Sequence, residues 1–229
     1  FFIALAGMVD SLMVSSMGAS AVAAVGLTTQ PKFMGLALFF AMNVSVSALV
    51  ARRRGEKNQR SANQILLVAI LFVIVATVVI SSACVMWANE IINFCGSAPE
   101  THEPAVIYYR IIMGCMIFNV LSMVINAAQR GSGNTMIAMR TNIVSNVVNI
   151  IANYLLIQGH LGFPALGIAG AAIATVFGTV IACIMSFASL FRRDGFVSIY
   201  YIMEQQIRPA LEPVISIIKL GFSVFIEQI

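Results

Sequence analysis

Charged residues are scarce in this chain, and their absence over long stretches is its most informative feature. Only 10% of the 229 residues are Asp, Glu, Lys or Arg, against about 25% in ordinary soluble domains. Residues 141–191 form a run of fifty-one residues without one of these four types. Because a bilayer-spanning helix needs about 20 apolar residues, this run can hold two spans. The composition predicts a polytopic membrane protein and excludes most soluble enzyme classes.

Shorter uncharged runs have the length of single spans. Nineteen uncharged residues lie between Lys32 and Arg52, twenty-nine between Arg60 and Glu90, and nineteen more follow Arg110. We expect six spans and the start of a seventh, which opens near position 214 and is cut off at the end of the sequence. We therefore interpret the chain as a piece of a longer protein. The six are residues 1–18, 33–51, 62–88, 105–128, 140–158 and 167–190.

Residues that carry enzyme chemistry or bind metals are few and scattered. The four cysteines have no Cys-x-x-Cys spacing and are better interpreted as small buried residues than as disulfide partners. His102 and His160 fall in predicted loops far apart in the sequence. The Gly-rich residues 129–135 lack the Gly-Lys-Ser/Thr ending of a phosphate loop and are expected to form a turn. We therefore expect no enzymatic activity, no cofactor, and no metal beyond a possible Na⁺.

The basic residues are distributed unevenly among the predicted loops. The side of the membrane reached after even-numbered spans carries ten Lys and Arg, whereas the side reached after odd-numbered spans carries only Lys32 and Arg110. Cytoplasmic loops are enriched in Lys and Arg, so we expect a multi-pass protein of the cytoplasmic membrane with its amino terminus in the cytoplasm. The net charge of +4 then reflects this bias and contact with membrane lipids, and we expect no nucleic-acid partner.

Asp10 lies in the apolar stretch of the first predicted span. An Asp at the centre of a membrane helix costs about 2.5–3.5 kcal/mol on insertion scales. A chain tolerates that cost when the carboxylate faces a cavity, a partner or a coupling ion. Asp10 is therefore a candidate ion ligand, and a structural Asp held by hydrogen bonds is the alternative.

Asparagines recur on one face of the fifth predicted span. Their spacing is 4, 3 and 4 residues, which places them on one side of a helix; they are Asn142, Asn146, Asn149 and Asn153. Asn119 and Asn126 form a similar pair in the fourth span. Amides that face lipid lose their hydrogen bonds, so we expect these to face other helices or water. They are either ligands and cavity residues, with Asn119, Asn126 and Asn146 lining a substrate cavity, or interhelical contacts worth only ~0.6 kcal/mol each.

The sixth predicted span has small residues four positions apart, at Gly170, Ala174 and Gly178. Small residues at this spacing allow two membrane helices to approach closely. Close packing is the main interpretation of this pattern, and Thr175 is the residue of this segment that offers a hydroxyl to a site.

Taken in chain order, these segments resemble the multidrug and toxic compound extrusion (MATE) family, within the wider flippase-like exporter superfamily. The resemblance runs from Asp10 to the end of the chain and rests on several short pieces in the expected order. They are Val-Asp at 9–10, the small-residue segment 18–27, the Arg-rich loop 51–57, Arg-Gly-Ser-Gly-Asn-Thr at 130–135, Asn-Ile-Ile-Ala-Asn at 149–153, the segment 166–175, and Ile-Lys-Leu-Gly-Phe at 218–222.

The resemblance implies twelve helices in two six-helix lobes that rock to give alternating access, with a Na⁺ or H⁺ gradient driving export of organic cations. Residues 1–208 would form the amino-terminal lobe and residues 209–229 the start of the seventh helix, in a protein that is monomeric at full length. The family's cation ligands map to Asp10, Asn149, Asn153 and Thr175. Asn153 departs from the family pattern, which has a second Asp there.

Two other functions stay open. A lipid-linked oligosaccharide flippase of the same superfamily needs a cationic cavity for pyrophosphate, and the predicted spans carry Lys or Arg only near their ends, as at Arg110 and Lys219. A membrane scaffold subunit that transports nothing gains little from the buried polar residues that the chain carries.

Overall fold

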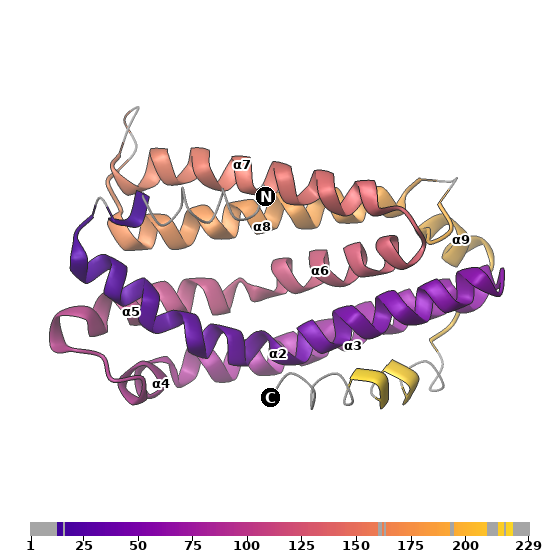
Figure 1. The fold of residues 1–229 in the computed structure, drawn as a ribbon, viewed down its shortest axis with the longest axis horizontal. Coiled ribbons are helices and arrows are strands. Elements are labelled where there is room, and N and C mark those ends of the chain that lie inside the picture. Colours follow the sequence, from indigo (N-terminus) through magenta and orange to yellow (C-terminus); the bar gives the residue numbers. More distant parts are fainter. Residues whose placement is uncertain are drawn as a thin grey trace. The chain divides into compact units, whose positions relative to one another are not determined.

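The computed structural model describes residues 13–15, 17–159, 162, 164–192, 195–209, 215–217 and 219–221. The regular elements of this part are helices (Figure 1), which confirms the predicted all-α class. In chain order they are α2 (Ala19–Gly55), α3 (Gln59–Met86), α4 (Ala88–Phe94), α5 (Pro99–Gly114), α6 (Met116–Gly131), α7 (Thr135–Ile157), α8 (Gly167–Leu190) and α9 (Ile199–Glu204).

Helix α2 begins fourteen residues before the predicted second span of residues 33–51, so the predicted start of that span after Lys32 is wrong. The helix already includes Pro31 and Lys32. A proline removes one helix hydrogen bond, a loss that membrane helices tolerate. The nearby hydroxyls are also accommodated inside the helix, because Thr28 and Thr29 both donate to the carbonyl of Val25.

The fourth predicted span is two helices rather than one, because α5 and α6 meet at Cys115 with a bend of 47°. The backbone of Cys115 leaves the helical region at this point. The hydroxyl of Ser81, on α3, donates to the carbonyl oxygen of Met113 at 2.6 Å. The broken turn is therefore stabilised by a side chain from a neighbouring helix.

The other spans lie close to their predicted positions. Helix α8 has the predicted bounds, α3 agrees to within three residues at each end, and α7 begins five residues early. By length and composition α2, α3 and α8 can each cross a membrane, and α5 with α6 adds a fourth if the bent pair is one span. Helix α7 is not among them, since its four asparagines and Arg140 lower its hydropathy. Most of the first predicted span, residues 1–12 and 16, lies outside the described residues.

The chain divides into two compact units, and the division crosses α2, α3, α6, α7 and α8. Unit 1 consists of Phe1–Gly35, Val78–Asn119 and Asn142–Ala182. Unit 2 consists of Leu36–Thr77, Val120–Thr141 and Cys183–Ile229.

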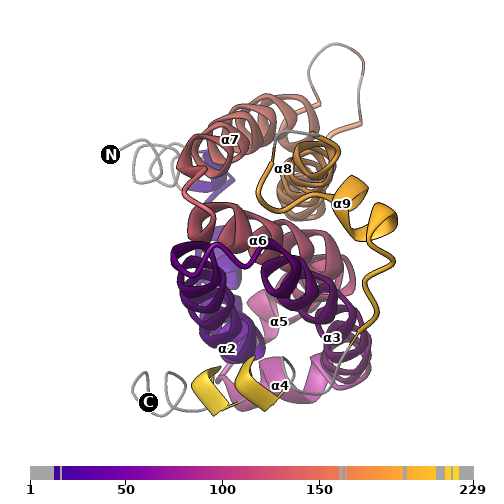
Figure 2. The same ribbon diagram turned by 90° about the vertical axis from the view of Figure 1, so that its right-hand side faces the viewer.

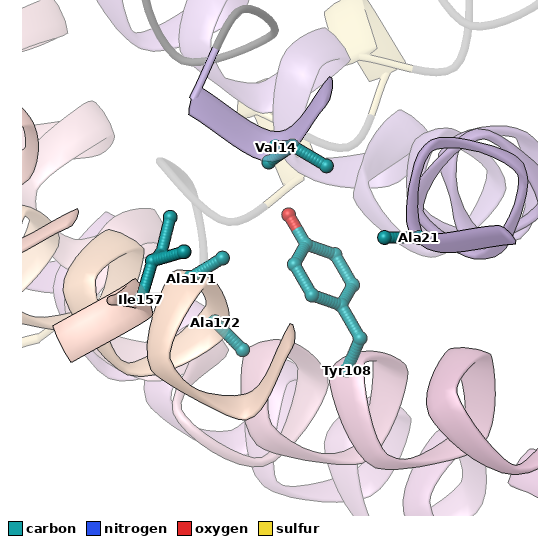
Figure 3. Packing of buried hydrophobic residues seen from close by; sticks show 6 residues of the cluster. All are labelled: Val14, Ala21, Tyr108, Ile157, Ala171 and Ala172. Carbon is teal, nitrogen blue, oxygen red and sulfur yellow. The ribbon is translucent and has the colours of Figure 1, made fainter. Parts of the chain in front are cut away.

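The core of unit 1 joins the start of the described chain to α5, α7 and α8. Val14 packs with Tyr108 of α5, Ile157 of α7 and Ala171 of α8, and the Tyr108 ring lies among these residues with its hydroxyl toward the segment of Val14 (Figure 3). Met13 and Met17 pack against the same cluster. Met13, Val14 and Met17 therefore lie against the ends of α7 and α8 that adjoin their connecting loop.

Candidate functional site

Helices α7 and α8 lie side by side and antiparallel in unit 1 (Figures 1 and 2), at a separation that glycine makes possible. A Cβ at Gly170 would lie 2.5 Å from the carbonyl oxygen of Leu156, and one at Gly178 would lie 2.9 Å from that of Ser145. Contacts this short do not occur with a real side chain. The predicted close approach through small residues is therefore confirmed, and its partner is α7.

Between these two glycines, polar side chains form a directed chain of hydrogen bonds. Asn153 Nδ2 donates to Asn149 Oδ1 at 3.3 Å, and Asn149 Nδ2 donates to Thr175 Oγ1 at 3.3 Å. The Thr175 hydroxyl donates in turn to the carbonyl oxygen of Ala171 at 3.0 Å. The structure thus brings together three of the four predicted cation ligands. The fourth, Asp10, lies outside the described residues.

The burial of the asparagines increases along α7. Asn142 is exposed, Asn146 and Asn149 are half-buried, and Asn153 has no exposed surface. A carboxamide oxygen has two lone pairs, and a hydroxyl oxygen has two besides its proton. Asn149 Oδ1 and Thr175 Oγ1 therefore each keep acceptor capacity beyond the bonds above. Amide, hydroxyl and carboxylate oxygens are ligands that hard cations accept, so the cluster suits a small cation.

Sequence reasoning missed Ser145 as part of this cluster. Its hydroxyl donates to the carbonyl oxygen of Gly178 at 2.8 Å, one turn away from the contact between Asn149 and Thr175. Its position was available as a signal, because Ser145 precedes Asn149 by four residues and shares its face of α7.

The residues predicted to line a substrate cavity are distributed over both units. Asn119 and Asn146 belong to unit 1 and are half-buried. Asn126 belongs to unit 2, where its side chain is 4% exposed and its amide bonds Ser122 of α6 and Ser186 of α8. Buried hydroxyls and amides extend this contact, since Gln129 Nε2 donates to Ser189 Oγ at 3.1 Å. In unit 2, α6 and α8 are therefore joined by hydrogen bonds between polar side chains. The assignment of the three asparagines to a substrate cavity stays a prediction.

The basic segments that the sequence marks as loops contact each other within unit 2. Only residues 132–134 of the predicted turn 129–135 lie between α6 and α7, because α6 continues to Gly131. Arg54, which is still within α2, donates to the carbonyl oxygen of Ser132. Glu56 accepts hydrogen bonds from Arg53 at 2.7 Å and Arg52 at 3.0 Å. Hydrogen bonds from Arg53 and then Arg52 hold the pKa of the Glu56 carboxyl below its ordinary value.

With this geometry established, the chain can be compared with known proteins. The protein-family model MatE matches residues 1–155, which is more than half of the chain. The chain belongs to the MatE family. The resemblance seen in the sequence is thereby confirmed.

Relatives and solved structures of MatE proteins agree with this assignment. A probable multidrug resistance protein NorM of Thermotoga maritima is 26% identical over 224 residues, which cover 97% of this chain and 47% of the relative. An FAD transporter of Shewanella oneidensis is 28% identical over 181 residues, 77% of this chain and 39% of the relative. Both are curated relatives of which this chain spans less than half.

The structural match covers nearly the whole chain. A MOP superfamily transporter from Pyrococcus furiosus, for which reverse polarity of the binding pocket suggests a different function, matches with a TM-score of 0.88 and 26% identity. The match covers 99% of this chain and 49% of that one. The chain is therefore an all-α membrane protein with the fold of about half a MatE transporter.

Proposed function

We propose that this chain is the amino-terminal half of a cation-coupled secondary exporter, in which residues 1–208 form one six-helix lobe and residues 209–229 begin the next. The exporter lies in the cytoplasmic membrane, with its amino terminus in the cytoplasm, and moves small organic cations outward by alternating access. Na⁺ or H⁺ is the coupling ion. Membership of the MatE family supports transport, and the site between α7 and α8 supports coupling to a cation.

The observation that carries the proposal is the chain of hydrogen bonds from Asn153 through Asn149 to Thr175. Amide hydrogen bonds between membrane helices contribute only ~0.6 kcal/mol on average, so helix association alone is a weak reason to bury them. Met13, Val14 and Met17, which follow Asp10 closely in the sequence, pack in one cluster with Ile157 and Ala171 at the end of the same helix pair. The Asp10 carboxylate can supply the negative charge that the amides lack.

In this mechanism Asp10 binds the ion electrostatically, while Asn149 Oδ1 and Thr175 Oγ1 replace part of its hydration shell. Asn153 holds Asn149 in place through its amide hydrogen bond. Ion entry disfavours the outward-facing state that holds substrate and so drives its release. A membrane potential supplies about 2.3 kcal/mol per elementary charge per 100 mV to this step.

Transport by the whole protein in proteoliposomes tests the proposal. A fluorescent organic cation is loaded, and an inward Na⁺ or H⁺ gradient is imposed. We expect gradient-driven export by the wild-type protein and loss of coupled export in Asp10→Asn, with unchanged membrane insertion. Wild-type rates in Asp10→Asn would refute the assignment of Asp10.

A second candidate substrate class is anionic, because one relative is an FAD transporter. The same proteoliposomes can be loaded with FAD in place of the organic cation. Export of FAD and retention of the cation would show that the substrate is anionic and that the proposed substrate class is wrong. The comparison of wild type with Asp10→Asn would still test the coupling site.

A further inference from the structure

We propose that Gly178 and Ser145 are positioning residues of the cation site, which set the separation and register of α7 and α8 at Asn149 and Thr175. The inference rests on the proposed function, because it concerns how well the same site binds its cation. Neither residue is a ligand in this proposal. They act through the two side chains beside them.

The contact between Ser145 and Gly178 joins a side chain of α7 to the backbone of α8. Ser145 Oγ donates to the carbonyl oxygen of Gly178 at 2.8 Å, so the two helices are hydrogen-bonded at this point. A Cβ at Gly178 would lie 2.9 Å from the carbonyl oxygen of Ser145 and 3.2 Å from the Cβ of Asn149. A side chain at this position would therefore press on both the backbone of α7 at Ser145 and the ligand residue Asn149.

The neighbouring hydrogen bond has little tolerance for a wider separation. Asn149 Nδ2 and Thr175 Oγ1 are 3.3 Å apart, slightly beyond the usual 2.7–3.2 Å range of an N–H···O hydrogen bond. An added methyl group at Gly178 must displace a backbone carbonyl, and this moves α8 away by a few tenths of an ångström. The bond between Asn149 and Thr175 is then lost, and the two oxygens no longer face one ion.

A matched glycine contact elsewhere in the chain provides a control that distinguishes an effect on the position of the site residues from a general effect on helix packing. Gly131 of α6 meets the backbone carbonyl of Ser47 on α2, in unit 2, so Gly131→Ala creates the same kind of clash between helices. Gly26 has open space at its Cβ position and provides a neutral substitution. Both controls lie outside the cation site.

The experiment measures sodium affinity by calorimetry and the pH–rate profile of export for the whole protein, with the midpoint of thermal unfolding recorded for each variant. We expect Gly178→Ala and Ser145→Ala to weaken cation binding by about fivefold to tenfold or more, the loss that one hydrogen bond represents. Gly131→Ala should lower the unfolding midpoint about as much as Gly178→Ala does, but it should not change cation affinity. Gly26→Ala should change neither the midpoint nor the affinity. Ser145→Thr, which keeps the hydroxyl, should retain most of the affinity.

Two results would overturn the inference. If Asn149→Ala weakens cation binding but Gly178→Ala and Ser145→Ala do not, positioning by these two residues is wrong while the proposed site stands. If Asn149→Ala leaves cation binding unchanged, the site itself is wrong and positioning falls with it. Ser145→Ala introduces no clash, so it keeps the test valid even if Gly178→Ala does not fold.

Discussion

Replacing Asn149 by alanine should break the chain of hydrogen bonds that runs from Asn153 on α7 to Thr175 on α8. The Asn149 side chain accepts a hydrogen bond from Asn153 and donates one to Thr175. Alanine removes both bonds and leaves the amide of Asn153, which has no exposed surface, without its partner on α7. The substitution therefore affects both stability and the proposed cation site.

The expected magnitude follows from these two bonds. Each bond contributes about 0.5–1.5 kcal/mol in general and ~0.6 kcal/mol on average between membrane helices. Both are long at 3.3 Å, so we expect a total loss of about 1–2 kcal/mol, a shift of a few degrees in the unfolding midpoint. Loss of one oxygen ligand should also reduce sodium affinity by about tenfold, since 1.4 kcal/mol corresponds to a factor of ten.

The assay is thermal unfolding of the detergent-solubilised whole protein over a range of NaCl concentrations. Asn142→Ala is the matched control, because Asn142 lies on the same helix but is exposed. We expect Asn149→Ala to have a lower midpoint and a weaker response to sodium than this control. Identical midpoints and identical sodium dependence in the two variants would refute the reasoning.

Three further results are expected. Asn153→Asp should raise sodium affinity by adding a negative charge beside the site, and an unchanged sodium titration would exclude Asn153 from it. Ser81→Ala should cost about 1 kcal/mol by removing the donor to the Met113 carbonyl; a midpoint equal to wild type would contradict this. Arg53→Gln should return the pKa of Glu56 toward its ordinary value. The pairing of Glu56 with Arg53 and Arg52 is complete at neutral pH and is lost as the pH falls through the lowered pKa. An NMR titration of the Glu56 carboxyl that is the same in wild type and Arg53→Gln would contradict this prediction.

The sequence predicts this fold best where apolar runs have clear boundaries. Helix α8 follows a Gly/Pro loop and runs without charge to residue 190, and its bounds were predicted correctly. The start of α2 was missed because the predicted span was taken to open after the charge of Lys32, whereas the helix begins at Ala19. The break at Cys115 was not predicted, because residues 105–128 contain no proline and the stabilising hydroxyl comes from Ser81, a distant residue.

The site was predicted in part for the same reason. The spacing of Asn149 and Asn153 places them on one face of a helix, and the resemblance to the MATE family paired them with Thr175. The periodicity within α7 could not show which turn of α8 they would meet. The hydrogen bonds between Ser145 and Gly178 and between Asn126 and Ser186 could not be predicted from spacing alone. Each depends on the register between two helices.

The most direct test of the cation site is the dependence of export on the imposed ion gradient in variants of its described ligands. The whole protein is reconstituted as wild type, Asn149→Ala and Thr175→Val, and export of the same substrate is measured with and without inward Na⁺ and H⁺ gradients. We predict that one gradient accelerates export by the wild-type protein, and that both variants lose this acceleration while retaining downhill exchange of substrate. Acceleration by the gradient that is as large in both variants as in wild type would contradict a coupling site between α7 and α8.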